Sequence, residues 1–208
     1  MSNPIEALIE KLFDDEDGLK EKFNFGARRL TAYEIGEARK VFGDRLDYDE
    51  VKIFEGAGLP NFIDDIGRFL KKMPKRAIEV KNAITLGNNC FFGRELKTDL
   101  IINPETQLDG GQMIEMSWLI HELTHAWQYQ TLGWDYLFAA LDAQRKLGEK
   151  VYEFGGADGL KKRRKENAAL KDFNMEQQGH IVQKYYEALK NGADGSAYEP
   201  FVREITGA

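Results

Sequence analysis

The sequence has a single cysteine and only three histidines. One cysteine excludes an intrachain disulfide framework and any zinc site built from several Cys residues. That residue, Cys90, lies in the apolar run Asn89-Cys90-Phe91-Phe92. In such surroundings a buried structural thiol is expected rather than a nucleophile.

Long apolar runs and an excess of positive charge are also absent. No stretch approaches the about 20 apolar residues of a transmembrane helix, and the N-terminus lacks the basic and apolar segments of a signal peptide. We therefore expect a protein that is cytoplasmic as synthesised and does not enter membranes, with export by a route that uses no cleaved signal left open. The formal net charge of −6 argues against nucleic acid as a partner.

The composition is sufficient for a sizeable hydrophobic core. Of the 208 residues, 42% are hydrophobic and 12% aromatic, as in ordinary globular domains. A chain of this length fits one domain, with or without an appended lobe. We divide it into an N-terminal helix or arm over residues 1–29 and a single domain over residues 30–208.

The most informative segment reads His-Glu-Leu-Thr-His-Ala-Trp at residues 121–127. On an α-helix His121 and His125 lie on one face, where two imidazoles can bind the same metal ion. Histidine suits zinc, and Glu122 between them is placed to accept a proton from a water molecule on the metal. The preceding residues 113–120 are largely apolar and predict a buried helix, where unpaired imidazoles are costly. This segment therefore predicts a zinc site with a general base.

A third protein ligand is expected, because catalytic zinc usually has three plus an open position. The histidine that some HExxH enzymes supply shortly after the motif is not indicated, since Gln128 stands at the glycine position of that extended motif. Residues 172–181 open a later helix and offer Glu176 and His180, one turn apart on one face. Either could bind the metal, and the other would then support the site or donate to an oxyanion. With the HExxH segment upstream, Glu176 is favoured.

Local patterns predict the elements around this segment. Thr31 and Glu34 form a capping box for a helix ending near Phe42, the HExxH helix should run over residues 111–131, and another helix over 136–147. Short β-branched or aromatic segments predict strands at residues 51–54, 77–80, 83–86, 90–92 and 100–102. A small sheet that precedes the HExxH helix and covers it gives an α+β class. The basic run at residues 161–165 is interpreted as a solvated helix face.

Several strings resemble a known family of zinc metallopeptidases encoded beside Rhs and Vgr secretion proteins. The strings are Leu30-Thr31-Ala32-Tyr33-Glu34-Ile35, Val41-Phe42-Gly43-Asp44-Arg45-Leu46-Asp47-Tyr48, Ala83-Ile84-Thr85-Leu86-Gly87-Asn88, residues 121–130 and Asn174-Met175-Glu176-Gln177-Gln178-Gly179. That family is related to the core metallopeptidase-like domain of extracellular contractile injection systems. The resemblance spans about residues 30–190.

The resemblance implies a mostly helical, zincin-like fold. It also implies His121, His125 and Glu176 as zinc ligands and Glu122 as the base. One departure concerns His180, where the family usually has an acidic residue. This leaves the role of His180 open.

Two functions follow as expectations. The first is a Zn2+-dependent metallopeptidase, linked to a secretion or contractile injection system, that hydrolyses a peptide or protein substrate with Glu122 as general base. His180, Tyr185 and Tyr186 are its candidate oxyanion donors. The alternative is a zinc-stabilised, catalytically vestigial binding or accessory module of a secretion system. A closed site with His180 as fourth ligand would favour that alternative.

Overall fold

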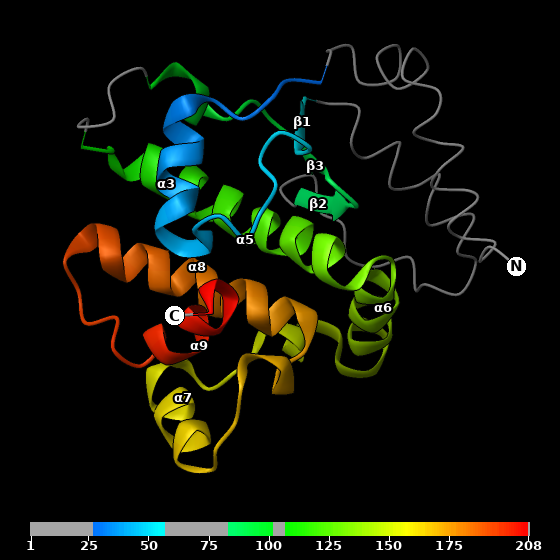
Figure 1. Ribbon diagram of the computed structural model, residues 1–208, viewed down its shortest axis with the longest axis vertical. Coiled ribbons are helices and arrows are strands. Elements are labelled where there is room, and N and C mark those ends of the chain that lie inside the picture. The colour runs from blue at the N-terminus through cyan, green and yellow to red at the C-terminus, as the bar shows by residue number, and fades with distance from the viewer. Residues whose placement is uncertain (1–26, 57–82, 102–106, 208) are drawn as a thin grey trace, which may run out of the picture.

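The computed structural model describes residues 27–56, 83–101 and 107–207. Most of the expected arm at residues 1–29 and the expected strand at 77–80 lie outside these ranges. The described part is a mixed α+β structure that is mostly helical and contains one small sheet (Figure 1). The predicted α+β class with a small sheet before the HExxH helix is confirmed.

The sheet has three strands in the order β1-β3-β2. Strand β1 (Lys52–Glu55) pairs in parallel with β3 (Asn89–Phe92), and β2 (Ala83–Leu86) pairs with β3 in antiparallel orientation. Gly87 has a φ of +64°, a left-handed conformation that glycine adopts at little cost in the tight β2–β3 turn. Three of the predicted strands are therefore confirmed.

The strand expected at residues 100–102 is wrong. Lys97–Leu100 forms the 3-10 helix η1, and Ile101 is in extended backbone without a strand partner. A short apolar run does not by itself distinguish a strand from another kind of buried segment. Ile101 is buried in the core although it is not part of the sheet.

Helix boundaries follow their capping signals closely. Helix α3 (Ala32–Phe42) has the predicted capping box of Thr31 and Glu34 and ends at Gly43. The HExxH helix is α5 (Gly110–Leu132), which begins at a capping box of Asp109 and Gln112. The other helices are α6 (Asp135–Leu147), η2 (Gly148–Tyr152), α7 (Gly156–Lys165), η3 (Leu170–Asp172), α8 (Met175–Asn191) and α9 (Glu199–Thr206).

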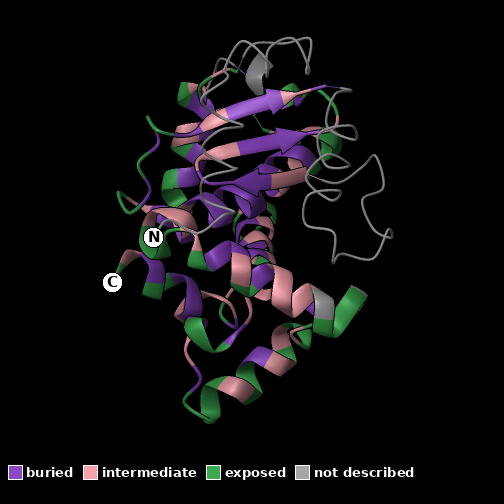
Figure 2. Ribbon diagram, turned by 90° about the vertical axis from the view of Figure 1, so that its right-hand side faces the viewer, coloured by how far each residue is buried: buried purple, intermediate pink, exposed green. Residues whose placement is uncertain are grey.

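Helix α5 is the centre of the structure. The sheet lies on one side of it and α8 and α9 lie on the other (Figure 1). Its middle residues, from Leu119 to Ala126, are all buried, and Figure 2 shows the strands above it coloured mostly as buried. None of the helices in the described ranges combines the length and apolar character needed to cross a membrane. The basic run of α7 is mostly exposed, as predicted.

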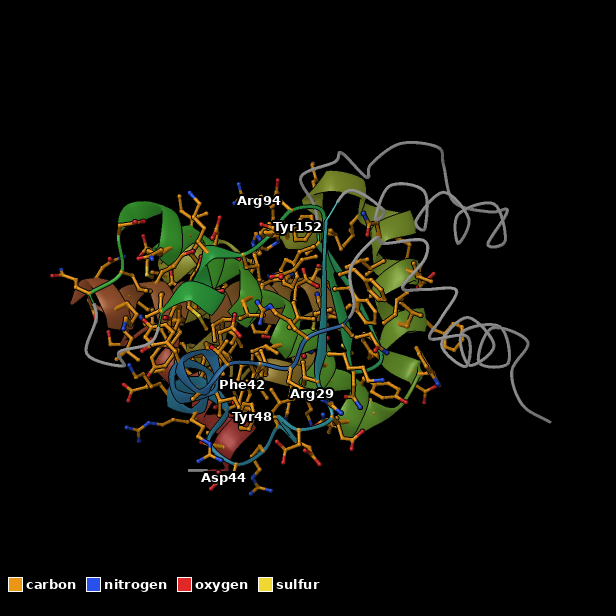
Figure 3. All side chains as sticks on the ribbon, turned by 90° about the horizontal axis from the view of Figure 1, so that it is seen from above. Arg29, Phe42, Asp44, Tyr48, Arg94 and Tyr152 are labelled. Atoms are coloured by element: carbon orange, nitrogen blue, oxygen red, sulfur yellow. The ribbon has the colours of Figure 1, made fainter. Side chains whose placement is uncertain are left out.

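A partly buried ionic cluster fixes α3 to the sheet. Arg28 donates to both oxygens of Glu34 at 2.8 and 3.0 Å and to both oxygens of Glu55 at 2.9 and 3.1 Å. Thr98 adds a donor to Glu34 at 2.8 Å. At the other end of α3 the hydroxyl of Tyr48 donates to the carbonyl of Gly43 at 2.7 Å, closing the turn that Figure 3 shows beside Phe42. Both contacts hold the helix that lies over one flank of α5.

Candidate metal centre

Three side chains from two helices meet at one point. The Nε2 atoms of His121 and His125, on α5, lie 3.2 Å apart, and Oε2 of Glu176, on α8, lies 3.4 Å from each. A tetrahedral zinc ion with bonds of about 2.0–2.1 Å places its ligand atoms about 3.3–3.4 Å apart. The triangle therefore has the size of one face of a zinc coordination tetrahedron, and the donor set of two imidazoles and a carboxylate suits this ion.

The start of α8 is built to present Glu176. Asn174 caps the helix by accepting from the backbone N–H of Gln177, whose side chain accepts in return from the N–H of Asn174. The amide of Asn174 also donates to the carbonyl of Val151 at 3.0 Å, which ties the cap to η2. Glu176 lies in the first turn, where the helix dipole favours a negative charge.

Burial and opposite charge shift the pKa values of Glu176 and His125. Burial alone would raise the pKa of Glu176, but His125 and His121 outweigh it and hold that pKa well below its ordinary value. Burial alone would lower the pKa of His125, but Glu176 and then Glu122 raise it to about 9. In the metal-free protein the carboxylate of Glu176 and the imidazole of His125 thus stabilise one another's charged forms, and a metal cation would take the place of the proton.

Glu122 lies on the sheet side of α5. It is 4% exposed, and its Oε2 accepts a hydrogen bond of 2.7 Å from the hydroxyl of Thr85 on β2. Burial raises the pKa of Glu122, while His121, His125 and Thr85 act in the opposite direction. A buried carboxylate whose proton affinity is increased is suited to accepting and returning a proton. Strand β2, which packs on α5, thus supplies the hydrogen-bond donor that holds the carboxylate of Glu122.

Helix α8 approaches the ring of His121 closely at Gly179. A Cβ atom at Gly179 would lie 2.8 Å from Cε1 of His121 and 3.0 Å from each of its ring nitrogens. Glycine at this position therefore lets α8 rest directly on the imidazole ring. This packing fixes the ring and brings Glu176, one turn earlier, to the histidines.

Replacing Gly179 with alanine tests this packing. Gly179→Ala is expected to lower the free energy of unfolding of the metal-free protein, because an overpacking cost of about 1–3 kcal/mol exceeds the gain in helix propensity. Gly36→Ala in α3 is the matched control: no atom lies within 4 Å of the added Cβ, so it should raise stability by up to about 1 kcal/mol. Urea unfolding measures both. Equal stabilisation by the two substitutions would contradict the close packing at His121.

His180 lies beside the ligands but outside the group that could hold a metal ion. Its ring centroid is 5.2 Å from that of His121 and 4.9 Å from that of Tyr152. Burial, followed by the charge of His121, lowers the pKa of His180 to about 4, so it is neutral at neutral pH. Its expected role as a catalytic group stays a prediction.

The tyrosines near the site differ from those expected. The hydroxyl of Tyr186 donates to Glu37 of α3 at 2.6 Å, so its interpretation as an oxyanion donor is wrong. Tyr185 packs near Gly195, in the turn that follows α8. Tyr152, labelled in Figure 3, instead packs against His180 with its ring tilted by 32°, and burial followed by the charges of Glu176 and Glu122 raises the pKa of its phenol. The sequence carries no local signal for Tyr152, because η2 is distant from the HExxH segment along the chain.

Comparisons with known proteins give one related protein and its structure. No protein-family model matches the chain. The type VI secretion system spike protein VgrG2b of Pseudomonas aeruginosa is 28% identical over 174 residues, which are 84% of this chain and 14% of the relative. The structure of the effector domain of Pseudomonas aeruginosa VgrG2b matches with a TM-score of 0.51 and 26% identity, over 85% of this chain and 82% of that one. The chain spans about one seventh of the spike protein and most of its effector domain. The expected link to Vgr secretion proteins is thereby confirmed.

Proposed function

We propose that the protein is a zinc-dependent metallopeptidase with a zincin-like fold, acting as an effector associated with a type VI secretion system. The observation that carries the proposal is the triangle of ligand atoms, whose edges of 3.2, 3.4 and 3.4 Å match a zinc tetrahedron. His121, His125 and Glu176 would hold the ion. The similarity to the effector domain of VgrG2b supports the association with secretion.

In this proposal each group has a distinct task. Zinc held by these three residues would supply Lewis acidity, which would polarise a substrate carbonyl and lower the pKa of a water molecule toward neutrality. Glu122 takes the proton of the attacking water and returns it to the leaving amine. Thr85 holds the carboxylate of Glu122 in place through its hydrogen bond. A peptide or protein is the proposed substrate, and hydrolysis of its amide bond consumes only water.

A zinc-stabilised binding module is the competing function. Such a site is closed by four protein ligands and has no use for a base. Within the described residues the group that could hold a metal has three members, and His180 is not one of them. A buried Glu122 in contact with the sheet is also expensive to retain without a task. These two observations favour the enzyme.

Metal removal tests the proposal. The purified protein is expected to contain about one zinc ion per chain and to cleave a proteome-derived peptide library, read as new termini by mass spectrometry. Treatment with a chelator should abolish cleavage, and added zinc should restore it. Stoichiometric zinc without any zinc-dependent cleavage would favour the binding module, and failure to bind zinc would overturn both functions.

A further inference from the structure

Two buried glutamines connect His125 to the start of α8. Gln128, one turn after His125 on α5, places its Oε1 2.8 Å from Nδ1 of the imidazole. Its Nε2 donates to the carbonyl of Met175 at 3.2 Å and to Oε1 of Gln178 at 2.9 Å. Nε2 of Gln178 in turn donates to the carbonyl of Phe173 at 2.8 Å. Gln128 is fully buried and Gln178 is 4% exposed, so water does not compete for these bonds.

The direction of every hydrogen bond in this chain is fixed by main-chain carbonyls. The carbonyl of Phe173 can only accept, so Gln178 must turn its nitrogen toward it and its oxygen toward Gln128. The carbonyl of Met175 can also only accept, which independently turns the nitrogen of Gln128 toward α8. Gln128 therefore presents its oxygen to the ring, and Nδ1 of His125 must carry the hydrogen. When a metal ion displaces the other ring proton, the lone pair that binds it is then on Nε2, the atom that faces Glu176.

The two histidines are held in different ways. Within the described part of the chain, Nδ1 of His121 is buried and has no hydrogen-bond partner. Its ring is held instead by the backbone of Gly179. The ring of His125 is oriented by the polar chain through Gln128. Of the two histidines of α5, only His125 therefore has a hydrogen-bond partner that fixes a hydrogen on Nδ1.

We propose that Gln128 and Gln178 form a positioning relay that holds the hydrogen of His125 on Nδ1 and couples this choice to the docking of α8. The proposal rests on the zinc site described above, because its consequence is that Nε2 is ready to bind the ion at the same time as Glu176 is brought into place. Neither glutamine touches substrate. Both act through His125, as partners of metal-binding histidines commonly do.

Removal of the relay is expected to weaken zinc binding without removing a ligand. Gln128→Leu should lower zinc affinity by about 10- to 100-fold, the range typical of partners of metal ligands. Gln178→Leu leaves the contact with His125 and the bond to the carbonyl of Met175 in place but removes one of the two acceptors that orient the amide of Gln128, so it should act in the same direction with a smaller effect. The double variant should resemble Gln128→Leu alone, since both substitutions break one chain. Competition with a chromogenic chelator measures these affinities.

The rate at which the Nδ1 hydrogen of His125 exchanges with water tests the relay directly, in a way that zinc affinity does not. In protein with ¹⁵N-labelled histidine, the Nδ1–H of His125 should exchange slowly with water in wild type, with or without zinc. This protection should be lost in Gln128→Leu and reduced in Gln178→Leu. The three histidines are assigned by single substitutions. If Gln128→Leu does not fold, Gln178→Leu carries the test.

Gln183→Leu is the matched control. Gln183 also bridges α8 and α5, through a bond to Ser117 at 3.4 Å, and it donates to Glu187 of its own helix at 3.1 Å; neither partner is a histidine. Zinc affinity and protection should be unchanged in this variant. An unchanged Nδ1–H signal in Gln128→Leu, or equal loss in Gln183→Leu, would overturn the relay. If wild type binds no zinc, the proposed function fails, while the exchange measurement on the metal-free protein still decides whether the relay exists.

Discussion

Glu122→Gln is expected to bind zinc as wild type does and to lose about 10²- to 10⁴-fold in kcat, the usual contribution of a general base. The glutamine keeps the shape of the side chain, and its carbonyl oxygen can still accept the hydrogen bond that Thr85 gives at 2.7 Å. What it cannot do is accept a proton. Peptide hydrolysis at saturating substrate and zinc content, measured on the same preparation, check the two halves of this prediction.

Glu115→Gln is the control for the loss of a buried carboxylate from the same helix. Glu115 is 5% exposed and accepts from the backbone N–H of Lys97 at 2.6 Å, so it stabilises the junction with η1 and has no contact with the ligands. This variant should keep its kcat. Hydrolysis by Glu122→Gln at the wild-type rate would exclude Glu122 as the base, and a joint loss of zinc and activity would leave Glu122 with a structural role.

Local signals in the sequence were sufficient for α3 and for the HExxH helix. The capping box of Thr31 and Glu34 and the stop at Gly43 define α3 to the residue, because caps satisfy backbone groups within the same few residues. The HExxH spacing likewise places two imidazoles together on any helix. Cys90 is fully buried and burial raises the pKa of its thiol, as the apolar run predicted.

Contacts between segments distant in the sequence could not be predicted in this way. Tyr186 lies on the apolar stripe of α8, yet its hydroxyl finds Glu37, 149 residues away. Nothing in the sequence distinguishes Thr85 and Gln128 from other polar residues. Thr85 reaches Glu122 because β2 packs against α5, and Gln128 reaches Met175 and Gln178 because α8 packs against α5. The candidate ligand Glu176 could be favoured only together with the HExxH segment, because its neighbours in the sequence resemble those of any helical Glu. The packing of α8 on α5 brings Glu176, among the glutamates of α8, to His121 and His125.

Glu176→Ala is expected to lower zinc affinity by more than about 100-fold, since even a partner outside the coordination sphere is worth about 10- to 100-fold. The substitution removes the oxygen that lies 3.4 Å from both Nε2 atoms. In the metal-free protein it also removes the carboxylate that contributes most to raising the pKa of His125 to about 9, so this pKa should fall. Chelator competition and an NMR titration of the ring test the two effects separately.

The third ligand is then decided by comparison with variants of the same helix. Glu187→Ala removes a carboxylate of α8 that pairs with Lys184 at 2.6 Å on the surface, and it should keep its zinc. His180→Ala should also keep zinc, because His180 lies outside the group of ligand atoms. Zinc retained in Glu176→Ala but lost in His180→Ala would transfer the third position to His180. Such a result would require α8 to turn, and the cap of Asn174 and the contact of Gly179 with His121 both oppose that movement. The geometry of the helix start therefore makes Glu176 the stronger assignment.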